Sequence, residues 1–190
     1  IAPLILASGS PRRQHLLREL GLTFEVVLRQ VAEDIPQGKT PAEVAEHLAW
    51  HKSEAYRDLI GDHIVLTSDT IVSLGGHLLE KPLDRADAIR MLQALSGQVN
   101  EVISGVCIRH REQMARFHAS TKVTFRHLTM AEITHYVDQF KPYDKAGAYG
   151  IQEWIGMVGI AKIEGDYYNV VGLPVGMVWD RLKSEGWASL

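Results

Sequence analysis

Short apolar runs and helical patterns alternate along the chain, and this alternation predicts an α/β protein. Apolar runs occupy residues 4–7, 64–74 and 99–108, and each run predicts a strand. Residues 115–127 alternate apolar or small side chains with polar ones. A period of two residues is typical of a strand with one covered face, which we expect here.

Helical patterns lie between these runs. Thr40 and Thr129 each begin a capping box, in which a glutamate follows three residues later. Pro11 and Pro174 each suit the first position of a helix, and Asp84 suits the position just before one. The helix after Thr40 is expected to bury Val44, Ala45, Leu48, Ala55 and Leu59. The last helix is expected to direct Met177, Val178 and Leu182 inward.

Shorter elements are predicted near the middle and the C-terminal end. Gly75 and Gly76 follow an apolar run and predict a hairpin turn. Residues 141–150 combine proline, aspartate and glycine, which predicts a loop. Two short apolar runs, 157–163 and 168–171, predict two further strands.

Length and composition limit the function classes. The chain has 190 residues, of which 46% are hydrophobic and 23% are charged, which excludes a disordered chain and predicts one domain over residues 1–190. The formal net charge of −3 gives no general attraction to nucleic acid polymers or anionic membranes. A site for a smaller polyanion therefore needs a local basic cluster. Cys107 is the only cysteine and has no intrachain disulfide partner.

Nothing in the sequence predicts a membrane segment. No apolar run approaches the roughly 18–20 residues that cross a bilayer. The first residues are apolar and are followed by Arg12 and Arg13, an order opposite to that of a secretory signal. We therefore expect a cytoplasmic protein.

The strongest candidate site follows the first apolar run, in a loop with small residues from Ser8 to Ser10. Ser10 is expected to cap the next helix, whose free N–H groups attract phosphate. Arg12 and Arg13 lie in the first helical turn, where cations oppose the helix dipole. A bound anion would remove this conflict, although two arginines paired with nearby carboxylates would do so as well.

Charged residues within or beside apolar elements form a second group of candidates. Asp69 interrupts an apolar strand, where a carboxylate suits a metal ligand or a general base, or else satisfies backbone N–H groups. Lys52 interrupts an apolar helix face and Lys81 follows the predicted hairpin, and both could simply extend to solvent. Glu33, in a loop, offers metal-binding oxygens or is only solvated.

The loop over residues 144–152 is a further candidate. Its small residues permit close approach to a ligand, and the Gln152 amide can both donate to and accept from a nucleobase edge. On composition alone the segment is also consistent with a tight turn. His47 and His51 lie one helical turn apart without a third ligand nearby, so a solvated face is expected rather than a metal site.

Six separated motifs give the chain a resemblance to a known family. They are Leu6-Ala7-Ser8-Gly9-Ser10-Pro11-Arg12-Arg13, Ser68-Asp69-Thr70-Ile71-Val72, Glu80-Lys81-Pro82, Leu95-Ser96-Gly97, the segment 144–152, and Asn169-Val170-Val171-Gly172-Leu173-Pro174. In this order they resemble the Maf nucleoside triphosphate pyrophosphatases. The resemblance implies an α/β fold distantly like the inosine-triphosphate pyrophosphatases, with an elongated mixed sheet and two lobes around a central cleft.

The resemblance also implies an activity. Family members hydrolyse a nucleoside triphosphate between the α and β phosphates, with Mg²⁺ or a similar divalent ion such as Mn²⁺, and many are homodimers. Such an enzyme would clear non-standard or excess nucleotides. Two other functions stay open: a non-catalytic, nucleotide-binding regulator of septum formation, and a 7-methyl-GTP pyrophosphatase.

Residue roles follow from the same resemblance. Asp69 corresponds to the catalytic carboxylate, which activates water or holds the metal, and Glu33 to a second metal carboxylate. The residues that match the family's triphosphate contacts are Ser8, Ser10, Arg13, Lys52 and Lys81. Substrate choice corresponds to Arg12, Thr70 and Gln152, and Thr70 resembles the branch that acts on dTTP and UTP. The chain departs from the pattern at Asn100, and at Glu153 and Trp154, which follow Gln152.

Overall fold

A computed structural model describes residues 1–190 and confirms the α/β class. The strands are β1 (Leu4–Leu6), β2 (Phe24–Val26), β3 (Ile64–Leu74), β4 (His77–Leu79), β5 (Val99–His110), β6 (Gln113–Phe125) and β7 (Ile160–Glu164). The helices are α1 (Pro11–Glu19), α2 (Pro41–Glu54), α3 (Arg85–Leu95), α4 (Met130–Phe140), α5 (Trp154–Gly159), α6 (Tyr167–Val171) and α7 (Val175–Ser184), with a 3₁₀ turn, η1, at Ala146–Ala148. No helix is both long enough and apolar enough to cross a membrane.

The strands form one mixed sheet in the order β2-β1-β3-β5-β6-β7, with β4 paired to β3. β1 runs parallel to β2 and β3, whereas β4 runs antiparallel to β3 and β7 runs antiparallel to β6. The chain divides into two compact units. Unit 1 contains residues 1–70, 104–119 and 172–190, and unit 2 contains residues 71–103 and 120–171.

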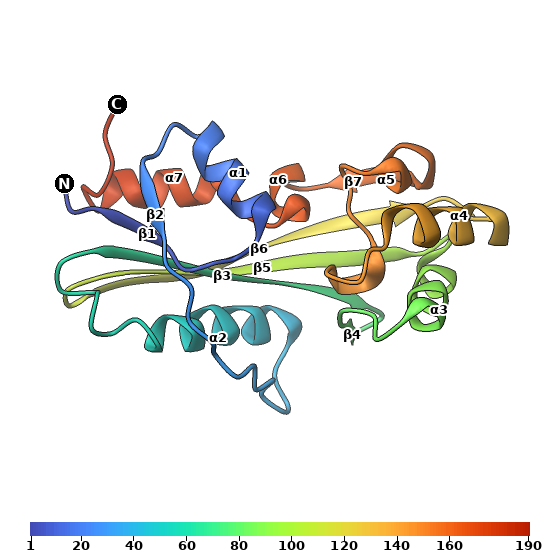
Figure 1. The fold of residues 1–190 in the computed structure, drawn as a ribbon, viewed down its shortest axis with the longest axis horizontal. Coiled ribbons are helices and arrows are strands. Elements are labelled where there is room, and N and C mark those ends of the chain that lie inside the picture. Colours follow the sequence, from blue (N-terminus) through green and yellow to red (C-terminus); the bar gives the residue numbers. More distant parts are fainter. The chain divides into compact units, whose positions relative to one another are not determined.

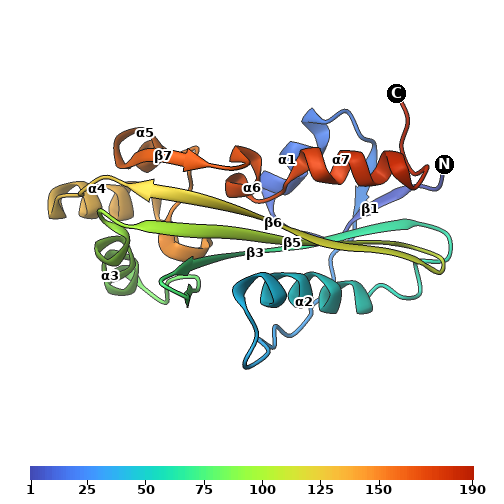
Figure 2. The ribbon, with the colours of Figure 1, turned by 180° about the vertical axis from the view of Figure 1, so that it is seen from behind.

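Unit 1 packs helices on both faces of its strands. Helices α1 and α7 cover one face, and α2 covers the opposite face (Figures 1 and 2). A buried cluster on this sheet contains Ile5, Ala7, Tyr56, Ile60 and Val65. The central strand β1 is fully buried, as expected for a strand with parallel neighbours on both sides.

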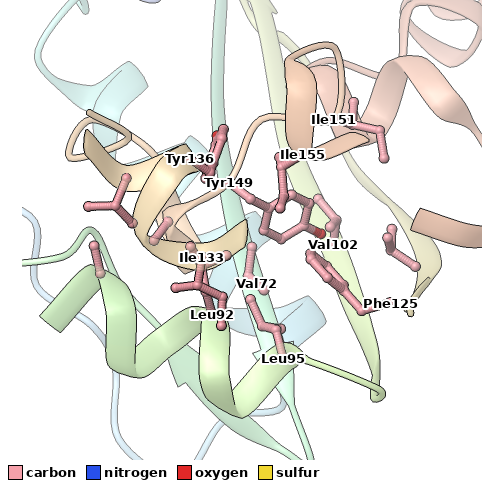
Figure 3. Packing of buried hydrophobic residues seen from close by; sticks show 14 residues of the cluster. Val72, Leu92, Leu95, Val102, Phe125, Ile133, Tyr136, Tyr149, Ile151 and Ile155 are labelled. Atoms are coloured by element: carbon pink, nitrogen blue, oxygen red, sulfur yellow. The ribbon is translucent and has the colours of Figure 1, made fainter. Parts of the chain in front are cut away.

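Unit 2 has an apolar core of its own (Figure 3). Leu92 and Leu95 of α3 and Ile133 of α4 are buried in it. The Phe125 ring meets the Tyr149 ring edge to face, with the centroids 4.9 Å apart. This geometry suits the opposite charge of an aromatic face and edge. The core therefore joins α3, α4 and the loop before α5 to the strands.

The strongest sequence signals are confirmed. Thr40 and Thr129 form complete capping boxes at α2 and α4, and Asp84 accepts a hydrogen bond from the Asp87 backbone at the start of α3. Strand β3 has the predicted bounds, and the hairpin turn at 75–76 leads into β4. On β6, Ala115, Thr121, Val123 and Phe125 are buried while the side chains between them are more exposed, which confirms one covered face.

Predictions for the C-terminal third are partly wrong. Residues 168–171 form helix α6 rather than a strand, and residues 157–159 belong to α5, so that β7 begins only at Ile160. Short apolar runs fit a buried helix turn as well as a strand, and Asp166 favours the helix by accepting from the Tyr168 backbone at 2.8 Å. The predicted loop over 141–150 is confirmed apart from the turn η1.

Two helix predictions need smaller corrections. Helix α2 ends at Glu54, and the chain then turns because the Ala55 and Tyr56 N–H groups bond to carbonyls three residues back. In α7, Pro174 is the N-cap and not the first helical residue, and Met177 is 42% exposed, whereas Val178 and Leu182 are buried as predicted.

Candidate active site

The loop between β1 and α1 is held by its own serines. Ser10 caps α1 by accepting a hydrogen bond from the Arg13 N–H at 3.4 Å. Ser8 Oγ accepts from the Ser10 N–H at 3.2 Å. This local geometry confirms the predicted cap and brings both hydroxyl groups next to the first turn of α1, where Arg12 also lies.

The Arg13 guanidinium is bound by three oxygens, none of them a carboxylate. Nε donates to the Gly172 carbonyl at 2.8 Å, Nη1 to Ser8 Oγ at 3.3 Å, and Nη2 to Thr70 Oγ1 at 2.9 Å. Burial lowers the pKa of Arg13, and the negative charge of Asp69 partly opposes this effect. A guanidinium in this setting has no ion-pair partner within the chain, which favours binding of an external anion.

Lys52 joins the two carboxylates that the sequence singled out. From the last turn of α2, its Nζ lies 2.8 Å from Asp69 Oδ1 and 3.4 Å from Glu33 Oε1. The Lys52 and Asp69 side chains are 21% and 13% exposed, whereas Glu33 is 55% exposed. Lys52 therefore forms a specific ion pair and does not simply extend to solvent.

Neighbouring hydroxyl groups fix the strand that carries Asp69. Thr67 Oγ1 donates to the Ala49 carbonyl of α2 at 2.7 Å, and Ser68 Oγ donates to the Gly105 carbonyl of β5 at 2.7 Å. Both side chains are buried. The Thr67 bond ties β3 to the helix that supplies Lys52, and the Ser68 bond ties β3 to β5, so both sides of the ion pair are held in place.

Lys81 and Gln152 belong to unit 2. Lys81 is exposed just after β4, and Gln152 is exposed between η1 and α5. The Gln152 amide has no hydrogen-bond partner within the protein, so it can bind a ligand through both its donor and its acceptor.

The loop that carries Gln152 is held by a network that the sequence did not indicate. The Gly150 N–H donates to Tyr136 Oη at 3.0 Å, and Tyr136 Oη donates to Glu153 Oε1 at 3.2 Å. Lys145 Nζ lies 3.2 Å from the same carboxylate oxygen. Burial raises the pKa of Tyr136, so its hydroxyl stays protonated and can donate.

We expect Tyr136→Phe to destabilise this loop. The substitution leaves the Gly150 N–H without its acceptor and Glu153 without one donor, at a cost of about 1–2 kcal/mol in the free energy of unfolding. Urea unfolding of the variant checks this value. Tyr143→Phe is the matched control, because no hydrogen bond of the Tyr143 hydroxyl supports this loop; equal stability of the two variants would contradict the role of Tyr136.

Other candidates from the sequence are structural. His51 Nε2 lies 3.1 Å from the Ala32 carbonyl, and its ring stacks on His47. No group of three or more histidine, cysteine, aspartate or glutamate residues is arranged to hold a metal ion. Asn100, where the chain departs from the family pattern, is buried; it accepts from the Tyr149 hydroxyl at 2.8 Å and donates to the Val123 carbonyl at 3.1 Å.

An α/β fold with a serine and arginine loop at a strand-to-helix junction, next to a lysine between two carboxylates, defines a protein that binds phosphorylated anions. The family described as "Maf-like protein" matches residues 3–185. The chain belongs to this family.

Two curated relatives agree with this assignment. The chain is 46% identical to a dTTP/UTP pyrophosphatase of Porphyromonas gingivalis, covering 96% of this chain and 94% of the relative. It is 46% identical to a dTTP/UTP pyrophosphatase of Flavobacterium psychrophilum, covering 93% and 91%. Among solved structures, a HAM1 protein from Coxiella burnetii is 16% identical with a TM-score of 0.45, covering 66% of this chain and 73% of that one.

Proposed function

We propose that this protein hydrolyses nucleoside triphosphates, with dTTP and UTP preferred, to a monophosphate and pyrophosphate. The observation that carries the proposal is the Asp69–Lys52–Glu33 cluster in the same unit as Arg13, a cation without a carboxylate partner. The curated relatives at 43–46% identity act on dTTP and UTP by their names, which supports this substrate choice.

Arg13 is proposed to bind the triphosphate. Three of its five N–H donors are used within the protein, and two are left for phosphate oxygens. A triphosphate carries about four negative charges, so we assign further contacts to the other cations and hydroxyls of the family motifs. These residues are Ser8, Ser10, Arg12, Lys52 and Lys81.

Asp69 is proposed to activate the attacking water. Its Oδ1 accepts from Lys52, whereas its Oδ2 has no hydrogen-bond partner within the protein. The free oxygen can take the proton of a water that attacks the α phosphorus. Attack there breaks the bond between the α phosphorus and the bridging oxygen, and pyrophosphate leaves. Arg13 and Lys52 neutralise negative charge on the phosphates and so lower the barrier to this step. The step needs no protein nucleophile.

A divalent cation fits the carboxylates of this cluster. The carboxylates of Glu33 and Asp69 both contact one cation, the Lys52 ammonium. Carboxylate oxygens are also ligands that Mg²⁺ and Mn²⁺ prefer. We propose that these two carboxylates hold Mg²⁺ or Mn²⁺. The ion would supply positive charge to the triphosphate.

Base choice is assigned to three positions. Thr70 and Gln152, together with Arg12, occupy the positions that the family motifs relate to substrate choice. The exposed amide of Gln152 suits the edge of a pyrimidine, which presents a donor and acceptors.

Pyrophosphate release from a panel of nucleoside triphosphates tests the proposal. We expect turnover of dTTP and UTP with Mg²⁺ to exceed that of dCTP, GTP and 7-methyl-GTP by at least about tenfold, a difference of about 1.4 kcal/mol in transition-state stabilisation. Preferred hydrolysis of 7-methyl-GTP would overturn the assigned base. Binding without hydrolysis of any member would overturn the enzyme and favour a nucleotide-binding regulator.

The proposal extends to the setting of the enzyme. We propose a cytoplasmic homodimer that clears non-standard or excess nucleotides. Sedimentation equilibrium checks the dimer, because a mass of 21.2 kDa at all concentrations would show a monomer.

A further inference from the structure

The hydroxyl group of Thr70 is fully used within the protein. It accepts from Arg13 Nη2 at 2.9 Å, lies 2.8 Å from Ser104 Oγ, and donates to the Gly172 carbonyl at 3.2 Å. A hydroxyl group has one hydrogen to donate and two lone pairs to accept with. Arg13 takes one lone pair of this oxygen, and the Thr70 hydrogen is directed at Gly172 or at Ser104, because either oxygen of the Thr70–Ser104 pair can be the donor. The Thr70 side chain is thus held in place by groups of the protein itself.

The same atoms determine the orientation of the Arg13 guanidinium. Arg13 Nε donates to the Gly172 carbonyl, the same oxygen that accepts from Thr70. Arg13, Thr70 and Gly172 therefore form a closed triangle of hydrogen bonds. A guanidinium is planar, so two bonds from Nε and Nη2 to fixed oxygens define its plane and aim its remaining donors.

The buried residue Ser104 contacts the Thr70 member of this triangle. Its side chain is fully buried, and its hydroxyl group meets Thr70 Oγ1 from strand β5, next to β3 in the sheet. No sequence motif singled out Ser104.

We propose that Thr70 and Ser104 are positioning residues for Arg13, and that Thr70 acts on triphosphate binding through this arginine. This inference rests on the proposed function and names how one residue of its site works. It predicts that the Thr70 hydroxyl contributes to the binding of every polyphosphate ligand, with or without a base.

Inorganic tripolyphosphate is the probe that separates the two roles, because it has no base. Calorimetric titration of the full chain with tripolyphosphate is compared between the unsubstituted protein, Thr70→Val, Thr70→Ser and Ser104→Ala. We expect Thr70→Val to weaken binding about tenfold, Thr70→Ser to restore most of the affinity, and Ser104→Ala to weaken it less than Thr70→Val does. Thr134→Val is the matched control, because the hydroxyl group of this threonine bonds only within α4 and its loss should leave binding unchanged.

Steady-state kinetics supply the second readout. For Thr70→Val we expect KM to rise for both dTTP and UTP, because both carry the triphosphate that Arg13 binds. Unchanged tripolyphosphate binding together with an altered order of bases would overturn the proposal and show that Thr70 contacts the base.

A double substitution tests whether the effect passes through Arg13. Arg13→Lys keeps the positive charge but loses the planar fork, so it should weaken tripolyphosphate binding by itself. In this background, Thr70→Val should cause less than a threefold further loss, because the two residues act as one unit. A full tenfold further loss would show independent roles and overturn the proposal.

The test of the positioning role can fail or succeed independently of the test of hydrolysis. Tripolyphosphate binding is measured without turnover, so it reports on Arg13 even if no nucleotide is hydrolysed. Absence of hydrolysis with the expected loss in Thr70→Val would overturn the enzyme and keep the positioning role. Thermal unfolding shows whether Thr70→Val folds. If it does not, the Ser104→Ala variant is used in its place. Tripolyphosphate binding by Ser104→Ala equal to that of the unsubstituted protein would then overturn the proposal.

Discussion

Asp69→Asn is expected to lower kcat for dTTP and UTP by about a thousandfold or more, which is the usual contribution of a general base together with a charged ligand. Asparagine keeps the shape of the side chain but can neither take a proton from water nor neutralise Lys52, which lies 2.8 Å from Asp69 Oδ1. Pyrophosphate release measures the loss. We expect tripolyphosphate to bind the variant at least as tightly, because one negative charge is removed from the site.

Asp62→Asn is the matched control for this experiment. Asp62 is exposed in the turn before β3, and its side chain makes no hydrogen bond within the protein. Its substitution should leave kcat unchanged. A kcat within about threefold of the unsubstituted enzyme in Asp69→Asn would remove Asp69 from the catalytic role.

Gly105→Ala is expected to destabilise unit 1 by about 3 kcal/mol, at the upper end of the cost of overpacking. A Cβ atom at this position would lie 2.0 Å from the Ala45 carbonyl oxygen and 2.3 Å from its carbon. Both atoms belong to the backbone of α2, so the whole helix must move to make room. Because α2 carries Lys52, activity should fall together with the free energy of unfolding, which urea denaturation measures.

Gly176→Ala provides the control for a glycine substitution. A Cβ atom at Gly176 meets no atom within 4 Å, and the residue lies inside helix α7. Alanine there should stabilise the protein by about 0.5–1 kcal/mol, because it restricts the unfolded chain and favours the helix. A Gly105→Ala variant as stable as this control would show that α2 does not pack directly on β5.

Local sequence patterns were sufficient for most elements of the fold. The capping boxes at Thr40 and Thr129 bond within three residues, so the sequence contains the whole interaction. Helix α6 was missed because a short apolar run is consistent with both a strand and a helix. Its buried Asn169, which donates to the Val102 carbonyl at 3.0 Å, depends on a strand 67 residues away in the sequence.

In the candidate site, too, local patterns were predicted from the sequence and contacts between distant residues were not. Asp69 and Lys52 attract attention singly, because each charge interrupts an apolar element and must be compensated there. Glu33 lies in a loop, and only the family resemblance related it to them. The triangle of Arg13, Thr70 and Gly172 could not be predicted, because its members are 57, 102 and 159 positions apart. No local pattern relates a hydroxyl group on one strand to a carbonyl before the last helix.

The bond between Arg13 and Gly172 also sets an order for folding during synthesis. The chain passes between the two units at four points, after residues 70, 103, 119 and 171. Unit 1 therefore stays incomplete until residues 172–190 leave the ribosome, whereas all of unit 2 is already made by residue 171. The Arg13 loop is therefore made long before its partner, and the bond from Arg13 Nε to the Gly172 carbonyl can form only near the end of synthesis. A premature stop just before residue 172 would leave the Arg13 guanidinium without this acceptor.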